Sequence, residues 1–267
     1  MNIHTGKNLL CSFLLSIFCF VLFSAGIQAG EFKWARAKFR IAEENLLNPS
    51  SIKSEDAMYN TNGMWNIALK GDQKILEDLE KYISIKVNKQ VFIVDFKNIN
   101  ELCKYPFIFM HASGTIVLNE QEKKNIREYI NKGGFIFAED CTFKGWLKEN
   151  ETLETPDYRP SFRYTSDTFF KGFKKMVEKE LFPGKEMVLL PKDHDIYRCL
   201  YKFPEGLPYL QGQSHGGYGY FDEKKRLRIF LSSNDIHCGW IEGWFNKTKC
   251  TEAVQMAMNI VLYAFSH

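Results

Sequence analysis

Residues 107–140 read FIFMHASGTIVLNEQEKKNIREYINKGGFIFAED, and this stretch decides the fold class. It opens with the run 107–111, which is apolar up to its last residue, His111, and closes with the apolar run 135–138, each of a length typical of a strand buried on both faces. Between them, Asn119 followed by Glu122 is a capping-box pattern that opens a helix, and Gly133-Gly134 ends it. A strand, a helix and a strand in this order predict two parallel strands joined by a crossover helix.

The same alternation continues on both sides of this unit. The sequence predicts further strands at residues 32–41, 90–96, 186–190 and 226–233, and helices at 72–83, from a cap at Ser166 to about residue 180, and at 251–265. The stretch 206–222 is rich in Gly and Tyr but lacks the lysine of a phosphate-binding loop, so it predicts a hairpin or a mobile loop. We therefore expect an α/β fold with a doubly wound, mostly parallel sheet, in a single domain after a signal peptide.

The first residues have the pattern of a secretory signal. Lys7 precedes a stretch without charge, residues 8–30, of which residues 9–22 are nearly all apolar, and small residues follow up to Ala29. We expect a signal peptide over residues 1–29, a mature domain over 30–267, and export to the periplasm or the outside of the cell. The alternative is an uncleaved membrane anchor, in which case the N-terminal segment alone would contact the membrane. Residues 24–26 argue against an anchor because they break the apolar run.

Charge and cysteine usage narrow the class of protein further. The formal net charge is +3, and basic residues are interspersed with acidic ones, so the sequence shows no nucleic-acid footprint. Because the cysteines after residue 30 are odd in number, an oxidising compartment would leave at least one thiol free, and the short polar and aromatic segment between Cys238 and Cys250 favours that pair as a disulfide. No CxxC spacing occurs, which argues against a zinc ribbon and leaves the identity of any divalent metal open. These cysteines are Cys103, Cys141, Cys199, Cys238 and Cys250.

Polar side chains follow four of the predicted strands, where ligands bind in open α/β sheets. As catalytic candidates we take Asp140, His194 and Asp235, because carboxylates and imidazoles serve as metal ligands or as acid and base. As ligand-binding candidates we take His111, Glu139, Asn234 and Trp240. The competing interpretation is structural: the carboxylates at 139–140 would cap the next loop, and the histidine at 194 would be a satisfied loop residue.

Other polar and aromatic residues have simpler explanations. His215 and His237 are expected at the surface and Trp244 as a packing residue, which is also the alternative to ligand binding for Trp240. Cys141 follows a strand, where a nucleophile would lie, but no glycine precedes it, and two acidic neighbours should raise the pKa of its thiol. The sequence therefore disfavours a cysteine nucleophile.

The sequence resembles the domain-of-unknown-function family numbered 4159 (DUF4159) over nearly all of residues 32–265. The resemblance rests on the order and spacing of short motifs. These are YPFIFM at 105–110, LNEQE at 118–122, GGF at 133–135, ED at 139–140, FP at 182–183, LPKDH at 190–194, SND at 233–235, GW at 239–240 and NIVLYA at 259–264. The chain departs from the family pattern at Glu139, where Asp is common, and at Asp195, where Pro often follows the Asp-His pair.

The resemblance implies a fold similar to that of class I glutamine amidotransferases and trehalose-utilisation-like proteins, a flavodoxin-like α/β sandwich. It implies no activity, because the family is defined without one. The nucleophile motif of the amidotransferases is missing here, so glutaminase chemistry is not expected.

Three functions remain as hypotheses. The first is an exported module that binds a small polar ligand, such as a carbohydrate, or a partner protein of the cell envelope at the carboxyl edge of its sheet. The second is a metal-assisted or acid/base hydrolase that uses Asp140, His194 and Asp235. The third is a structural subunit of an envelope assembly.

Overall fold

A computed structural model of the chain describes residues 31–42, 65, 69–83, 86–141, 167–211 and 214–267. Residues Phe32–His267 form one compact unit, and the predicted signal segment lies outside the described residues. Among the helices of the described ranges, none has both the length and the apolar character that a membrane span requires.

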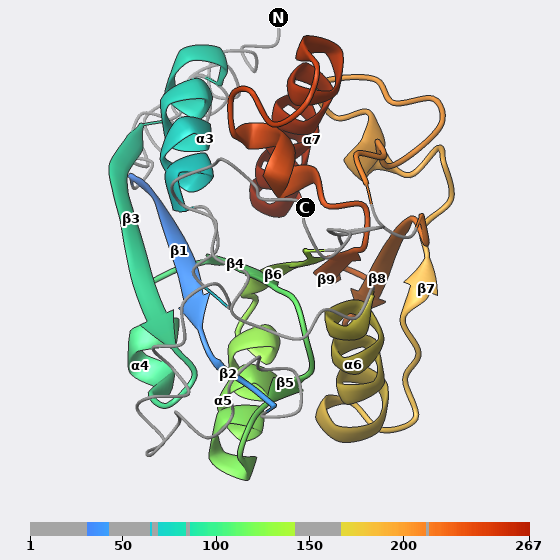
Figure 1. Cartoon of the computed structure of the whole chain (residues 1–267). Helices are drawn as coiled ribbons and strands as arrows, with labels where there is room; N and C mark the ends of the chain where they lie inside the picture. The colour runs from blue at the N-terminus through green and yellow to red at the C-terminus, as the bar shows by residue number, and fades with distance from the viewer. Residues whose placement is uncertain (1–30, 43–64, 66–68, 84–85, 142–166, 212–213) are drawn as a thin grey trace, which may run out of the picture. The chain divides into compact units, whose positions relative to one another are not determined.

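A seven-stranded sheet runs through this unit in the order β3-β1-β4-β6-β9-β8-β7 (Figure 1). Its strands are β1 (Phe32–Lys38), β3 (Val87–Asp95), β4 (Phe107–Ala112), β6 (Phe135–Asp140), β7 (Val188–Leu189), β8 (Gly217–Phe221) and β9 (Leu227–Ser232). The strands from β3 to β9 are parallel, and β8 pairs antiparallel with both β9 and β7. The prediction of a mostly parallel α/β sheet is thus confirmed. A separate two-stranded ladder joins β2 (Arg40–Ile41) to β5 (Ile116–Val117).

Helices cover both faces of the sheet (Figure 1). One face carries α3 (Leu69–Tyr82) and α7 (Lys247–Ser266), and the other carries α4 (Ile99–Leu102), α5 (Glu120–Asn131) and α6 (Thr168–Met176), which continues into a π-helical turn, η3 (Val177–Leu181). Successive side chains of a strand point to opposite faces, so Phe107 and Phe109 pack under α3 and α7 while Ile108 and Met110 pack over α5 and α6. Two short 3-10 helices complete the described chain, η4 (Asp195–Tyr197) and η5 (Ile236–Trp240).

The α5 segment forms as its sequence predicts. Asn119 Oδ1 accepts a hydrogen bond from the backbone of Glu122 at 2.9 Å, and the Glu122 carboxylate accepts one from the backbone of Asn119 at 2.8 Å. At the other end, a Cβ on Gly134 would lie 2.3 Å from the ring of Tyr129, so only glycine allows the chain to turn back closely under the helix. For α6, the predicted cap Ser166 lies outside the described residues, and the helix begins after Asp167.

The strand order places a topological switch point between β1 and β4. From β1 the chain moves to β3 on one side, and it then crosses to β4 on the other side of β1. The connections therefore leave the carboxyl ends of β1 and β4 in opposite directions, and this is the position where doubly wound sheets bind their ligands.

The hairpin between β8 and β9 gives a prediction about acid stability. Asp222 accepts hydrogen bonds from the backbone of Lys224 and Arg226 and forms ion pairs with the side chains of Arg226 and Arg228. Burial opposes the charge, but these donors lower the pKa of Asp222 to about 2. A carboxyl group whose pKa is lower in the folded than in the unfolded state stabilises the fold fully above its unfolded pKa. That stabilisation is lost as the pH falls through the folded pKa.

We therefore expect Asp222 to contribute about 2 kcal/mol to the free energy of unfolding at neutral pH, lost between about pH 4 and pH 2. Urea unfolding of the wild type and of Asp222→Asn across this range measures the effect. The two stability curves should converge as the pH falls. A constant gap between them would contradict the prediction.

Candidate functional site

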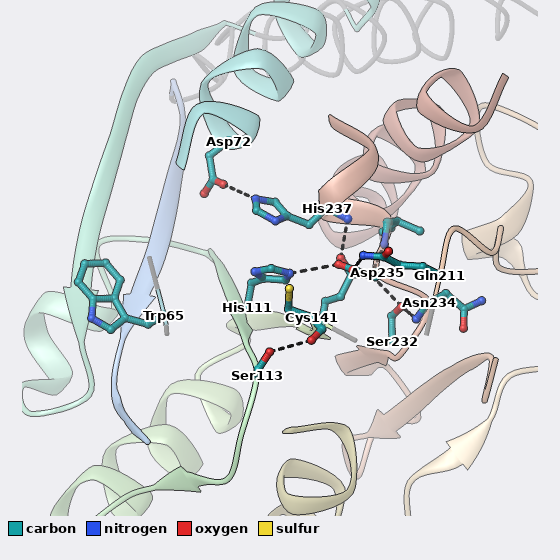
Figure 2. A network of polar contacts seen from close by, with 12 residues as sticks. Trp65, Asp72, His111, Ser113, Cys141, Gln211, Ser232, Asn234, Asp235 and His237 are labelled. Carbon is teal, nitrogen blue, oxygen red and sulfur yellow. Dashed lines mark hydrogen bonds and ion pairs between the residues drawn. The ribbon is translucent and has the colours of Figure 1, made fainter. Parts of the chain in front are cut away.

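A network of buried polar side chains lies at the carboxyl ends of the parallel strands (Figure 2). The central strands and α3 contribute a guanidinium, carboxylates and imidazoles, all without solvent exposure. They are Arg36 of β1, Asp72 of α3, His111 of β4, Glu139 of β6, and Asp235 and His237 after β9. Charged groups are rarely buried unless each is paired, so their partners decide what the network can do.

The ion pair between Arg36 and Asp72 lies at one side of this network. Arg36 Nη1 donates to Asp72 Oδ1 at 2.7 Å and Arg36 Nε donates to the carbonyl of Trp65 at 2.8 Å, while the indole of Trp34 donates to Asp72 Oδ2 at 2.8 Å. Burial works against the Asp72 charge, yet Arg36, His237 and Trp34 outweigh it and lower the pKa of this carboxyl. Asp72 is therefore an ionised carboxylate that fixes its neighbours.

One of these neighbours is His237. Its Nε2 lies 3.0 Å from Asp72 Oδ1, which can only accept, and 3.3 Å from Arg36 Nη1, which can only donate. We assign the ring proton to Nε2 because the contact with the carboxylate is the shorter one. The lone pair is then on Nδ1, which is buried and has no hydrogen-bond partner among the described residues. Burial lowers the pKa of His237 to about 4, so the ring is neutral near pH 7. The network thus holds a neutral imidazole with a free acceptor.

Glu139 holds the segment that carries His237. Its two carboxylate oxygens accept from the hydroxyl of Ser232 at 2.9 Å and from the backbone N–H groups of Ile236 at 2.8 Å and His237 at 2.7 Å. Burial, with a smaller effect of Asp235, raises the pKa of Glu139 to about 8, against the effect of these donors. The carboxyl ties the start of η5 to β6.

A second group of side chains lies beside η5 at the carboxyl ends of the strands. His111, Cys141, Asp235 and Cys238 are all buried, and each offers one atom that could bind a metal within 4.8 Å of the corresponding atoms of the other three. We call these four residues the donor cluster. His111 Nε2 lies 3.5 Å from Asp235 Oδ1, while the amide of Gln211 donates to Asp235 Oδ2 (Figure 2). Asp235 has a left-handed backbone with φ of 55°, which is uncommon for a residue other than glycine and is found at functional sites.

Burial determines the charge state of this group. It raises the pKa of the Cys141 thiol to about 12 and that of the Asp235 carboxyl to about 7, and it lowers the pKa of His111 well below its usual range. The cysteines are therefore thiols and the imidazole is neutral around pH 7. With a protonated thiol, Cys141 is a poor nucleophile.

Comparison with known families identifies the group to which the chain belongs. The family described as "Domain of unknown function (DUF4159)" matches residues 55–265. The chain is a member of the DUF4159 family. A comparison with curated proteins finds no match. The match includes both histidines of the network and leaves out the strand that carries Arg36.

The DUF4159 domain brings some predicted site residues together and separates others. Asp235 and His111 lie in the donor cluster, and Glu139 beside it holds η5. Asp140 lies next to Glu139 but points to the other face, where its Oδ2 accepts from the backbone of Phe170 at 2.7 Å. His194 is the N-cap of η4, and its ring packs against Tyr263 at a centroid distance of 5.4 Å. The joint catalytic role of Asp140, His194 and Asp235 stays a prediction.

The remaining ligand-binding candidates lie close to η5. Asn234 Nδ2 donates to the carbonyl of Pro208 at 3.1 Å, and its backbone N–H donates to the hydroxyl of Ser232 at 3.1 Å. Trp240 is 2 % exposed, and its ring packs against Trp34 and His237. Their role in binding a ligand also stays a prediction.

Two expectations from the sequence are wrong. His237 was expected at the surface but is buried, because Asp72 and Glu139 hold its ring and its backbone inside the network. The Cys238–Cys250 disulfide is absent from the described residues: Cys238 is a buried thiol of the donor cluster, and Cys250 on α7 donates to the carbonyl of Phe245 at 3.5 Å.

Sequence reasoning missed Arg36, Asp72 and Cys238 as parts of the site. Asp72 lies in the first turn of a predicted helix, where an acidic residue is expected for helix stability alone. One signal was available: Asp235 and Cys238 have the same two-residue interval as the CxxC pattern of metal sites, with an aspartate in the first place.

Proposed function

We propose that this DUF4159 domain binds a small polar ligand at the carboxyl ends of β1 and β4, and that His237 Nδ1 accepts a hydrogen bond from it. The observation that carries the proposal is His237 Nδ1 itself, a buried ring nitrogen with no partner among the described residues; with the ring proton on Nε2, Nδ1 is an acceptor. A buried acceptor without a partner costs about 1–3 kcal/mol, so a ligand that donates to it recovers that free energy. Hydroxyl and amine groups, as in sugars and amino sugars, have the required donors.

The sheet supports the location and the finer fold assignment. The parallel strands, numbered along the chain, stand in the order second-first-third-fourth-fifth, which is the order of flavodoxin-like sheets. We propose a flavodoxin-like fold of the class I glutamine amidotransferase type on this basis. The charge-free apolar N-terminal segment supports the further proposal that the domain is exported.

A hydrolase is the second candidate, favoured by the pairing of His237 with Asp72. A carboxylate that fixes the imidazole tautomer and leaves the other nitrogen free is the arrangement of a general base. In this case Nδ1 would take the proton of a ligand hydroxyl or of water. The residues differ from those predicted, since His237 takes the place of His194.

Binding is tested by thermal melting of the full chain with a panel of monosaccharides, polyols and amino sugars. A ligand that binds only the folded state stabilises it by about 2.7 kcal/mol at a hundredfold excess over its Kd. We expect at least one probe to raise the Tm of the wild type, and His237→Gln to abolish the shift. The glutamine amide keeps a donor for Asp72 but removes the lone pair of Nδ1.

The matched control is His215→Gln, because His215 also pairs with a carboxylate, through Nε2 at 2.8 Å from Asp167 Oδ2, outside the network. This variant should retain the shift. Chromogenic ester, phosphate and glycoside substrates test the hydrolase candidate with the same two variants. If no probe shifts the Tm of the wild type, or if the shift survives in His237→Gln, His237 is not the acceptor of a ligand.

A further inference from the structure

The donor cluster next to His237 consists of cysteine, histidine and aspartate, the residue types that commonly bind zinc and other transition metals. Two thiols, one imidazole and one carboxylate converge, and none of the four side chains has solvent exposure. They come from three strand ends: His111 from β4, Cys141 after β6, and Asp235 with Cys238 after β9. We infer that His111, Cys141, Asp235 and Cys238 form a binding site for one zinc ion. This inference goes beyond the proposed ligand site, because none of its donors is His237.

The distances fit a tetrahedral ion of this size. Zinc bonds of ~2.0–2.3 Å to nitrogen, oxygen and sulfur place neighbouring ligand atoms roughly 3.3–3.8 Å apart in a tetrahedron. His111 Nε2 and Asp235 Oδ1 are 3.5 Å apart, within this interval and too far for a strong hydrogen bond. The largest separation in the group is at most 4.8 Å, so no pair of donor atoms needs to close in by more than about 1.5 Å.

The chemistry of the donor set favours zinc over magnesium or calcium. Thiolate and imidazole ligands select zinc and other soft or borderline ions, whereas magnesium and calcium require oxygen ligands. The set provides four protein ligands, the number found in closed structural zinc sites. We therefore expect the ion to link β4, β6 and η5 at the carboxyl edge of the sheet.

The surrounding residues hold the donors as outer ligands do in metal sites. Gln211 binds Asp235 Oδ2 and leaves Oδ1 directed at His111. Cys141 is fixed through its backbone: its N–H donates to the carbonyl of Ala112 at 3.0 Å, and the hydroxyl of Ser113 donates to its carbonyl at 2.7 Å. Such partners restrict the ligands to few conformations, which lowers the entropy lost when the ion binds.

The charges also fit a divalent ion. Two thiolates and one carboxylate around a 2+ ion leave one net negative charge, and Arg36 is the cation beside the group. Its Nη2 donates to His111 Nδ1 at 3.4 Å, so this contact has to open when zinc at Nε2 moves the ring proton to Nδ1. The competing interpretation is a metal-free cluster in which the thiols donate to each other and to Asp235. The two interpretations differ in whether the protein retains a stoichiometric ion, which can be measured directly.

The experiment uses the full chain, stripped with a chelator and titrated with zinc and, separately, with cobalt. We expect one zinc per chain by mass spectrometry of the metal, and a sulfur-to-cobalt charge-transfer band with the visible spectrum of tetrahedral cobalt. Cys141→Ser and Cys238→Ser should each weaken zinc binding more than about 100-fold, since even outer partners of metal ligands contribute 10- to 100-fold. Cys250→Ser is the matched control, a half-buried thiol outside the cluster, and should bind zinc like the wild type.

A measurement on the wild type alone covers the case in which a cysteine variant does not fold. The thiols are alkylated in partly denaturing urea, with and without zinc, and the labelled positions are read by peptide mass spectrometry. Zinc should slow labelling of Cys141 and Cys238 and leave that of the exposed Cys103 unchanged. If the wild type retains no ion and zinc changes no labelling rate, the cluster is metal-free and the inference is overturned.

The outcome is independent of the proposed ligand site. A sugar or amine probe that shifts the Tm through His237, with no metal bound, would leave the proposed function intact and remove the zinc site. Stoichiometric zinc without any such shift would support the zinc site and contradict the proposed ligand site.

Discussion

Asp72→Asn should lower the free energy of unfolding by about 3–5 kcal/mol, the loss expected when one partner of a buried ion pair is removed. The Arg36 guanidinium would keep its charge in a site without solvent exposure, and the neutral amide would no longer compensate it. His237 would also lose the carboxylate that assigns its tautomer. Urea unfolding of the full chain measures the change.

Asp78→Asn is the matched control, because it is the same substitution on the same helix. Asp78 pairs with Lys74, whose side chain is 46 % exposed, and a helical surface pair of this kind contributes about 0.3–0.5 kcal/mol. Replacing both Arg36 and Asp72 by apolar residues of similar volume should cost less than Asp72→Asn alone, since neither charge of this pair then remains buried. Equal losses for Asp72→Asn and Asp78→Asn would show that the buried pair contributes no more to stability than a surface pair.

Glu139→Gln is expected to have the second largest effect, a loss of about 2–3 kcal/mol. In either protonation state both oxygens of the Glu139 carboxyl keep a lone pair, and together they accept three hydrogen bonds. A glutamine side chain has one acceptor oxygen, and its amide nitrogen would face a backbone N–H of η5. Since the donors at Ile236 and His237 hold the turn that carries Cys238, we expect weaker zinc binding as well as lower stability.

Asp140→Asn is the control for this substitution, on the next residue of the same strand. One oxygen of Asp140 accepts from the backbone of Phe170, and the other has no partner among the described residues. An asparagine can keep the first contact and place its amide at the unpartnered position, so the change in stability should be small. Chemical denaturation compares the two variants, and a larger loss for Asp140→Asn than for Glu139→Gln would refute this account of the carboxyl edge.

Asp72→Asn and Glu139→Gln both act on η5, the short segment after β9. Asp72 holds the side chain of His237, and Glu139 holds its backbone. Because η5 carries one candidate for ligand binding and one for zinc binding, its stability and the function of the site should change together. Variants that loosen η5 should therefore lose binding before they lose the sheet.

The sequence by itself determined the layers of this protein. Hydrophobic runs such as 107–111 and the capping box at Asn119 depend on neighbours a few residues away, so local periodicity and local hydrogen bonds were enough to predict them. The polar residues at the strand ends were visible for the same reason. They include His111, Glu139 and Asp235, which the structure places at the site.

Only the tertiary structure decided which of these residues meet. Neighbouring strands lie about 4.8 Å apart, and β8 separates β7 from β9, so His194 beyond β7 lies away from the network although it also follows a strand. His237 meets Asp72, 165 positions earlier in the chain, because α3 and η5 pack on the same face of the sheet. No local pattern encodes a contact over such a distance; the order of the strands and the packing of the helices create it, and with it the buried site.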